Sequence, residues 1–326
     1  MIRSKIFILA TFSIEQALSP IYLACFSHDW RETIPQEWQK FRDKVSDNFR
    51  VILVYLIRRE TGGLIAFLLP RAIWTHKSVR ADLGLYLFNR VLGVLGVFAR
   101  FAAVPAVAAW VASLVPRTAL DSAALSPLAL ALIVFVLTDF SNYWTHRLHH
   151  DTKALWPIHA VHHSASVLTP LTAYRQNPLS GMVSIALTTV IFGVIFGLMV
   201  GTFTPDLSIA EIAGANAFVV LTNMTVTNFL HSHIWISFGP KLEHVLISPA
   251  MQQVHQVHHS IEPRHFNRNY GQALAIWDWM FGTLYVIREK EVVTFGLDDE
   301  ADAPLMTHRL GPLLIDPVRR ILGPSR

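Results

Sequence analysis

Residues Leu179–Phe203 read LSGMVSIALTTVIFGVIFGLMVGTF and contain no charged side chain. An α-helix needs about 20 consecutive apolar residues to cross the hydrocarbon core of a bilayer, so this stretch predicts a membrane-spanning helix. A second apolar stretch, Leu207–Phe229, follows after the turn Thr204–Asp206. Together the two stretches predict a helical hairpin in the membrane.

The composition agrees with a membrane protein. Hydrophobic residues make up 52% of the 326 residues and charged residues 15%, whereas a soluble domain usually carries about 25% charged residues. Ser126–Tyr143 is a further candidate span, and Val91–Val115 is long enough for one span with a polar defect at Arg100 or for two short re-entrant pieces. We therefore expect an all-α integral membrane protein with about four spanning helices, paired as helical hairpins and capped by a cytosolic helical domain.

The apolar stretches nearest the N-terminus are weaker candidates. Ile6–Phe26 is interrupted at Glu15, and Val51–Leu69 is interrupted at Arg58 and Glu60. The first is expected to be an interfacial helix or a poor span, and it lacks the small-residue cleavage site of a secretory signal. The second is expected to be amphipathic or bent.

The spacing His-x-x-His-His occurs three times, in His146–His150, His159–His163 and His255–His259, and His231 and His233 lie between the second and third copies. Neutral imidazole is the commonest protein ligand for transition metals. On a helix, residues three and four apart share one face, so each triplet can turn several ring nitrogens toward one point. A closed structural zinc site needs only four ligands. The number of histidines therefore indicates a centre with two metal ions.

The predicted hairpin brings all three triplets to one membrane face, because two crossings separate the second triplet from the third. The turn Thr204–Asp206 on the opposite side has no basic residue. Cytoplasmic loops carry an excess of Lys and Arg, which predicts that the histidine face is cytoplasmic. The basic residues assigned to that face are Arg147, Lys153, Arg175, Lys241, Arg264, Arg268, Arg288 and Lys290.

Several classes of function are excluded or disfavoured. The only cysteine is Cys25, so neither an intrachain disulfide nor a thiolate cluster is possible. The first histidines of the triplets are followed by Arg147, Ala160 and Gln256, so the zinc-protease pattern His-Glu-x-x-His is absent. No stretch resembles a nucleic-acid surface or a dinucleotide fingerprint. Electrons for redox chemistry must then come from a separate protein. A metal carrier or electron-transfer protein is the alternative, although the predicted spans themselves contain no histidine.

Three segments resemble the histidine boxes of the fatty acid hydroxylase/sterol desaturase superfamily: Asp139–His150, His159–Ser164 and Gln253–Ser260. Asn269–Gly271, followed by Ile276–Asp278 and Phe281–Thr283, resembles its C-terminal signature. The resemblance covers about residues 130–290. It implies an integral membrane, His-ligated dimetal oxygenase that hydroxylates or desaturates lipids or sterols with O2 and electrons from a donor protein. Iron is the expected metal, although zinc could occupy the site in a purified sample.

The resemblance also implies individual roles. The implied metal ligands are His146, His150, His159, His162, His163, His231, His255, His258 and His259. The family pattern does not require a histidine at His149 or His233, so these two are secondary candidates. Family members often have histidine where this chain has Asn177. This difference concerns a contact with the substrate or with a metal ligand, and not the metal site itself. The donor is expected to be a ferredoxin- or haem-carrier-type protein with its reductase, and the other partners are a lipid or sterol-like substrate and membrane lipids, without nucleic acid.

Other polar residues are candidates for supporting roles. Asp139 is predicted to fix an imidazole tautomer, to pair with Arg175 or to end a helix, and Asp278 to orient a ligand histidine or to pack structurally. The isolated histidines are expected at the surface or the membrane interface: His28, His76, His244, His265 and His308. We predict an N-terminal extension over residues 1–80, a catalytic domain over 81–291 and a polar C-terminal tail over 292–326, the last as a loop or a short partner-facing segment.

Overall fold

The computed structural model describes residues 64–101, 103–115, 127–203, 230–233, 244, 252–286 and 293–323. These residues form α-helices and 3-10 turns and no strand, with one isolated bridge between Ser260 and Phe295. The expected all-α class is therefore confirmed for the described part of the chain. The chain divides into two compact units, Met1–Leu64 and Ile65–Arg326, and the described residues belong almost entirely to the second.

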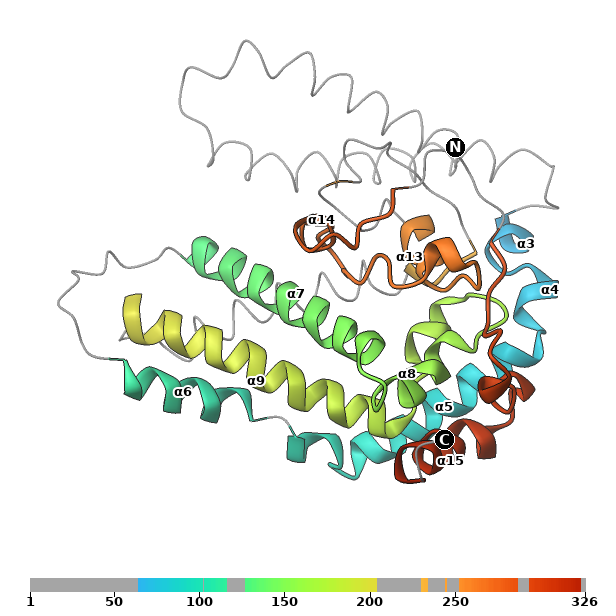
Figure 1. Ribbon diagram of the computed structural model, residues 1–326, viewed down its shortest axis with the longest axis horizontal. Helices are drawn as coiled ribbons and strands as arrows, with labels where there is room; N and C mark the ends of the chain where they lie inside the picture. Colours follow the sequence, from blue (N-terminus) through green and yellow to red (C-terminus); the bar gives the residue numbers. More distant parts are fainter. Residues whose placement is uncertain are drawn as a thin grey trace, which may run out of the picture. The chain divides into compact units, whose positions relative to one another are not determined.

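Three helices of the second unit, α6 (Val104–Leu114), α7 (Pro127–Asp151) and α9 (Pro178–Phe203), pack side by side (Figure 1). Ala108, Leu130, Val134 and Phe196 form the apolar cluster between them. Glycines at intervals of four residues on α9, at positions 193, 197 and 201, let α6 approach closely. A Cβ atom at position 197 would lie 2.6 Å from the carbonyl oxygen of Ala108, so the contact requires glycine there.

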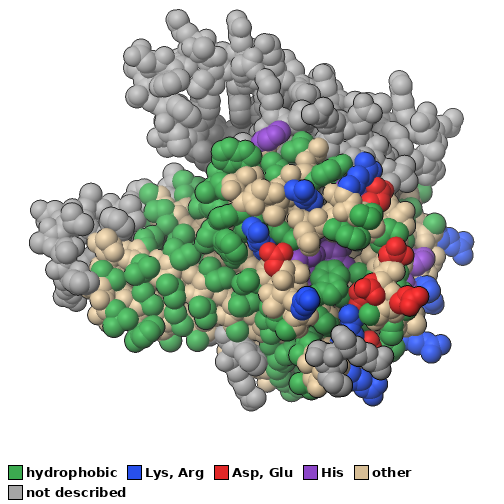
Figure 2. Space-filling view, viewed as in Figure 1, with side chains coloured by type: hydrophobic (Ala, Val, Ile, Leu, Met, Phe, Trp, Pro, Cys, Tyr) green, Lys and Arg blue, Asp and Glu red, His purple; other side chains and the backbone are tan. Residues whose placement is uncertain are grey.

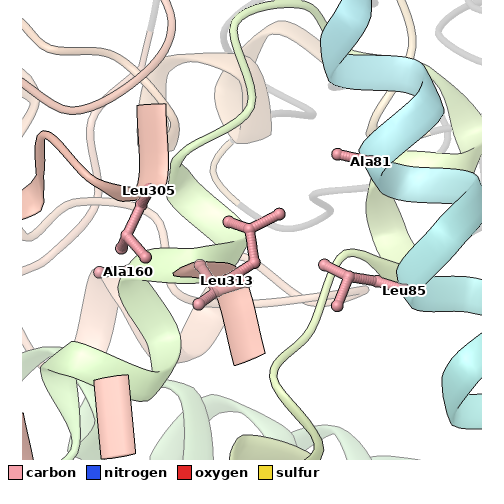
Figure 3. Close-up of a cluster of buried hydrophobic side chains, with 6 residues drawn as sticks. Ala81, Leu85, Ala160, Leu305 and Leu313 are labelled. Carbon is pink, nitrogen blue, oxygen red and sulfur yellow. The ribbon is translucent and has the colours of Figure 1, made fainter. Parts of the chain in front are cut away.

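The remaining described elements lie, in chain order, before and after α8 (Trp156–His163). They are α3 (Leu64–Leu68), α4 (Arg71–Trp74), α5 (Lys77–Val94), η2 (Phe98–Phe101), η3 (Pro170–Tyr174), α13 (Gln252–His258), η5 (Pro263–His265), α14 (Ile276–Met280), η6 (Glu300–Asp302), η7 (Leu305–Thr307) and α15 (Leu310–Leu322). An apolar cluster joins α5, α8, η7 and α15 through fully or almost fully buried side chains (Figure 3): Ala81, Leu85, Ala160, Val161, Leu305 and Leu313. This cluster fixes α8, which carries one of the histidine triplets.

The cluster also shows what the C-terminal segment does. The sequence led us to expect a loop or a short partner-facing segment after residue 292, yet α15 is a helix whose Leu313 is fully buried against α5 and α8. The expected loop is wrong for residues 310–322. Residue 81, the predicted start of the catalytic domain, lies inside α5, and the two predicted boundaries between the three domains remain predictions.

The prediction for Leu179–Phe203 is confirmed as a helix, since α9 spans it. Of the described helices, only α9 is long and apolar enough to cross a membrane, and 22% of its most apolar window is buried inside the protein. Ser126–Tyr143 lies almost entirely within α7, whereas Leu207–Phe229, Ile6–Phe26 and most of Val51–Leu69 lie outside the described residues. The count of about four spans, their pairing as hairpins and the cytosolic domain therefore stay predictions.

The stretch Val91–Val115 is not one continuous helix, so the single-span alternative is wrong. Helix α5 ends because Gly96 adopts a left-handed φ of 71°, and the amide of Val97 donates to the carbonyl of Leu92 at 3.0 Å. This is the usual glycine termination of a helix. Helix α6 begins afresh with Pro105 in its first turn, where proline is tolerated because that amide has no helical acceptor.

Candidate metal centre

The structure brings the three histidine triplets together from helix ends. His146 and His150 lie one turn apart near the end of α7, and α8 contributes three histidines within two turns. His255 and His258 lie on α13, directly before His259, and His231 follows Leu230 in the short described segment 230–233. Residues separated by four positions share a helix face, so each helix directs its rings toward the same interior region.

The rings form two groups, within each of which the possible ligand atoms lie within 4.8 Å of one another. We call them the first and second histidine groups. The first contains His146, His150, His159, His163 and His258, and the second contains His162, His231, His255 and His259. These are the nine residues for which the family resemblance implies ligand roles, and the division into two groups agrees with two metal ions.

The two secondary candidates lie outside both groups. The Nδ1 atom of His149 is 2.7 Å from the carbonyl oxygen of Thr145, one turn earlier on α7. The Nε2 atom of His233 is 2.8 Å from the carbonyl oxygen of Phe67. Both rings are thus bound to backbone.

The separations in the second group suit a shared cation. Nε2 of His231 lies 3.1 Å from Nε2 of His162 and 2.8 Å from Nε2 of His255, which in turn lies 3.2 Å from Nε2 of His259. Metal–imidazole bonds of about 2.0–2.1 Å would put neighbouring ligand nitrogens about 2.9–3.4 Å apart. Four converging nitrogens cannot all share protons with one another, because a neutral imidazole has one donor and one acceptor. A metal ion fits this donor set.

The first group is oriented by backbone carbonyls. Nδ1 of His146 lies 2.8 Å from the carbonyl oxygen of Tyr270, and Nδ1 of His258 lies 2.7 Å from that of Arg268. A carbonyl oxygen only accepts, so each Nδ1 carries the proton and leaves the Nε2 lone pair available. The Nε2 atoms of His146, His150 and His258 are buried without a hydrogen-bond partner. Buried nitrogens of this kind are rare, and a metal ion would satisfy them.

Burial also sets the protonation state of the rings. Desolvation is the largest cause that lowers the pKa of His162 and of His258, each to about 3. Burial also lowers the pKa of six further rings of the two groups, and neighbouring histidines add to the effect: His146, His150, His159, His163, His255 and His259. These imidazoles are therefore neutral at pH 7, the form that binds metal.

Asp278 supports the first group through the backbone and does not touch a histidine. Its carboxylate accepts from the amides of Tyr270 and Gly271, both at 2.8 Å, and from the hydroxyl of Thr283 at 2.6 Å. Burial raises the pKa of Asp278, while these hydrogen bonds oppose the shift. The bond to Tyr270 holds the chain segment whose carbonyl oxygen orients His146. Asp278 thus acts on His146 only through the backbone of Tyr270, and the choice between orienting a ligand histidine and packing structurally stays a prediction.

Asp139 has a related role, because it holds residues 273–277, which follow the segment held by Asp278. Its two oxygens accept from the amides of Ala273 and Leu274 and from the indole of Trp277, each at 3.0 Å. Its carboxylate contacts neither an imidazole nor Arg175, and it lies in the interior of α7. None of the three roles predicted for it describes these bonds.

Arg175 is fully buried and ties α8 to α5 and to the C-terminal segment. It pairs with Asp82 at 2.7 Å, donates to the carbonyl oxygen of Val161 at 2.9 Å and donates to Nδ1 of His308 at 3.1 Å. Val161 directly precedes His162, so the guanidinium braces the part of α8 that carries the ligands. Burial raises the pKa of Asp82 and lowers that of Arg175, and their attraction opposes both shifts.

Asn177 lies away from both histidine groups. Its amide nitrogen donates to the carbonyl oxygens of Leu313 at 2.9 Å and Leu314 at 3.1 Å, and its oxygen accepts from the amide of Leu179 at 3.0 Å. The side chain therefore caps the start of α9 and attaches α15 to it.

Some of the isolated histidines were misjudged from the sequence. His265 is fully buried and His308 is 8% exposed, so the expectation of a surface or interfacial position is wrong for both. His76 is half-buried and caps α5 by accepting from the amide of Ser78, whereas His244 is exposed and His28 lies outside the described residues. The sequence also did not reveal the orienting carbonyls of Arg268 and Tyr270, because every residue type has a carbonyl. The signature around Asn269 was the only available signal.

Two adjoining groups of buried imidazoles at the ends of helices define a helical protein with a candidate dinuclear metal centre. The family model for fatty acid hydroxylase matches residues 131–283, a range that contains all nine members of the two groups. Residues 131–283 thus match the fatty acid hydroxylase family, and the resemblance found in the sequence is confirmed.

Curated relatives each match about half of the chain. Alkylglycerol monooxygenase of Xenopus tropicalis is 30% identical over 165 residues, which are 51% of this chain and 32% of the relative. Ornithine lipid hydroxylase of Rhizobium tropici is 30% identical over 160 residues, 49% of this chain and 43% of the relative. A putative Delta(7)-sterol-C5(6)-desaturase of Arabidopsis thaliana is 28% identical over 164 residues, 49% of this chain and 50% of the relative.

The matched segment thus spans between a third and a half of the length of these relatives. All three carry names of oxidoreductases. No solved structure matches the chain.

Proposed function

We propose that the chain is a membrane-bound, O2-dependent oxidoreductase with two metal ions, most simply iron, that hydroxylates a C–H bond of a lipid or sterol-like substrate. The observation that carries the proposal is the division of nine histidines into groups of five and four, with ligand atoms within 4.8 Å of one another in each group. Seven of the nine are buried, and His146 and His150 are half-buried. The fatty acid hydroxylase domain and the names of its relatives support the substrate class.

The nine histidines of the two groups would hold the metals. Imidazole ligands suit iron, zinc or copper better than hard ions, and iron bound in this way supplies oxygen chemistry strong enough to break an unactivated C–H bond. The carbonyls of Arg268 and Tyr270 keep protons at Nδ1 of His258 and His146, so that Nε2 faces the group. Seven of the nine histidines are buried and two are half-buried, which limits the access of water to the rings.

The membrane placement rests on α9 and on the distribution of charge. Over α6, α7 and α9 the visible face is largely apolar, whereas charged side chains gather over the part of the molecule that holds the histidines (Figure 2). We propose that α9 crosses the bilayer, that the protein is multi-pass and that the histidine face is cytoplasmic. A separate ferredoxin- or haem-carrier-type donor then delivers electrons on that face.

Hydroxylation is our first proposal because two of the relatives are named as a monooxygenase and a hydroxylase. Desaturation of the same substrate class is the second, since another relative is named as a sterol desaturase. The two outcomes differ in which atom reacts after the first hydrogen is removed, which depends on substrate placement to a fraction of an ångström.

The test compares lipids from membranes with wild-type protein and with the His258→Ala variant. A mass increase of 16 that depends on the wild type supports hydroxylation, and a decrease of 2 indicates desaturation. Metal analysis and an optical spectrum test the alternative class: a Soret band, or fewer than about two metal ions per chain after loading, would contradict the dimetal oxygenase. Full turnover with NAD(P)H alone would contradict a separate donor.

A further inference from the structure

A second concave site lies away from the histidines. It is an open groove of about 720 Å³ between the C-terminal half of α5, η2, η3 and the beginning of α9. Sites for small molecules have volumes of about 300–1,000 Å³. None of the nine histidines of the two groups lines it, so the groove is separate from the candidate metal centre.

Arg90 is the only charged side chain among the described residues that line the groove. Its guanidinium carbon lies 5.0 Å from the ring centroid of Tyr86 and 5.8 Å from that of Tyr174, and the two rings meet edge to face at 5.2 Å. Arg90 is exposed, and no carboxylate in the described parts of the chain forms an ion pair with it. Stacking on rings leaves the N–H groups at the edge of the guanidinium plane available, and these bind phosphate in pairs.

The rest of the groove is suited to an apolar chain. Phe98 and Ile185 line it, and Phe98 lies over Gly181, where a Cβ atom would be 3.2 Å from the ring. Val94, also in the lining, is 89% exposed, and Val91 beside it on α5 is 58% exposed. A hydrocarbon chain placed here would cover apolar surface that otherwise faces water.

We propose that this groove binds an anionic phospholipid of the surrounding membrane, with its phosphate on Arg90 and an acyl chain along Val94, Phe98 and Ile185. The inference rests on the proposed crossing of the bilayer by α9, because the groove lies at the N-terminal end of that helix, where the headgroup region would be. The single unpaired cation favours a headgroup with net negative charge over a zwitterionic one. The apolar lining favours a lipid over a soluble phosphate compound.

The experiment uses the full chain, purified in detergent, stripped of lipid and titrated with phosphatidylglycerol or phosphatidylcholine under native mass spectrometry. Arg90→Gln should weaken phosphatidylglycerol binding about 10-fold, which corresponds to about 1.4 kcal/mol. The matched control is Arg80→Gln, an exposed arginine on the same helix that does not line the groove, and it should change the affinity less than about 2-fold. Preference for phosphatidylglycerol in the wild type should disappear in the Arg90 variant.

The proposal would be overturned if phosphatidylglycerol affinity fell equally in both variants or did not fall in Arg90→Gln. It would also be overturned if millimolar inorganic phosphate displaced the lipid, which would indicate a simple anion site. Lipid oxidation and metal content are measured on the same samples. Phosphatidylglycerol binding that depends on Arg90, in a protein without two metals or lipid oxidation, would contradict only the proposed function. An unchanged affinity in an active, metal-loaded Arg90 variant would contradict only the lipid site.

Discussion

The two histidine groups are held in different ways. In the first, His146 and His258 are oriented by carbonyl oxygens at 2.8 and 2.7 Å. In the second, the Nδ1 atoms of His255 and His259 are buried without a hydrogen-bond partner, and the Nε2 atoms of the group converge on one another. The protein alone therefore fixes the tautomers of His146 and His258, whereas the order of the second group depends more on a bound cation.

The supports of the two groups also differ in reach. Asp278 holds the segment that orients His146, so its effect is confined to the first group. Arg175 braces α8 through the carbonyl oxygen of Val161, and α8 contributes His162 to the second group and His159 and His163 to the first. Asp278 thus supports the first group alone, whereas Arg175 supports both groups. Substitutions at the two positions should therefore affect metal binding differently.

The largest effect is expected from removing one ligand of each group. His258→Ala and His162→Ala should each lower the metal content by about one ion per chain, because each leaves the other group intact. Lipid oxidation should fall by more than the roughly 100-fold known for losses outside the ligand sphere. Metal analysis together with the lipid mass assay checks both numbers.

His149→Gln and His233→Gln serve as matched controls, since both rings lie outside the groups and contact backbone carbonyls. Their metal content should equal that of the wild type. A loss of one metal ion per chain in either control would contradict the division of the ligand histidines into groups of five and four.

The next largest effect is expected at the shared support. Arg175→Met removes the partner of Asp82 and leaves a buried carboxylate unpaired, which typically costs about 3–5 kcal/mol. Because α8 serves both groups, the two metal sites should weaken together. Unfolding in detergent, followed by metal titration, measures both effects.

Replacing Asp82 as well, in the double variant Arg175→Met with Asp82→Leu, should recover part of the lost stability, since no unpaired charge then remains. Arg264→Gln, which breaks an exposed pair with Glu262, should cost less than about 1 kcal/mol. Loss of metal from one group alone in the Arg175 variant would contradict a shared support.

A smaller and selective effect is expected for Asp278→Asn. The amide keeps the shape of the carboxylate but turns N–H groups toward the amide of Tyr270 or Gly271, so the orienting segment shifts. Metal affinity of the first group should fall about 10- to 100-fold, the usual range for such supporting residues, while that of the second stays unchanged. Competition with a chelator resolves the two affinities.

Asp139→Asn is the control for this substitution, because Asp139 holds the neighbouring amides of Ala273 and Leu274, whose carbonyls orient neither His146 nor His258. If the metal affinity of both histidine groups fell equally in the Asp278→Asn variant, the segment around Tyr270 would act on the whole metal centre and not on the first group alone.

The sequence predicted the elements of this site better than their supports. The triplets pointed to eight of the nine histidines of the two groups, because imidazole is chemically distinctive and helix periodicity relates residues four apart. The ligand role of His231 and the secondary rank of His149 came from the family resemblance. The helix α9 was predictable from its apolar run. The carbonyl of Tyr270 and the position of His308 depend on which segments meet in space, and no local pattern encodes that. The break at Gly96 could have been anticipated, since glycine commonly ends helices.

The smallest effect is expected from His308, which is a hydrogen-bond partner of Arg175. Its Nδ1 accepts from Arg175 at 3.1 Å, and its Nε2 lies 3.0 Å from the hydroxyl of Ser166. Burial, and then the charge of Arg175, lower the pKa of His308 to about 4, against about 6.5 in an unfolded chain. Between these two values the unfolded state binds a proton that the native state does not.

The stability contributed by neutral His308 is therefore complete above about pH 6.5 and is lost as the pH falls toward 4. Between pH 7 and pH 5 the wild type should lose roughly 1–2 kcal/mol more than His308→Gln. Metal release at low pH affects both proteins and cancels in this difference, which unfolding in detergent at the two pH values measures. If the wild type and His308→Gln lost the same stability between pH 7 and pH 5, the support of α8 by Arg175 would not depend on a neutral His308. The shared support of the two groups would then consist of Arg175 and Asp82 alone.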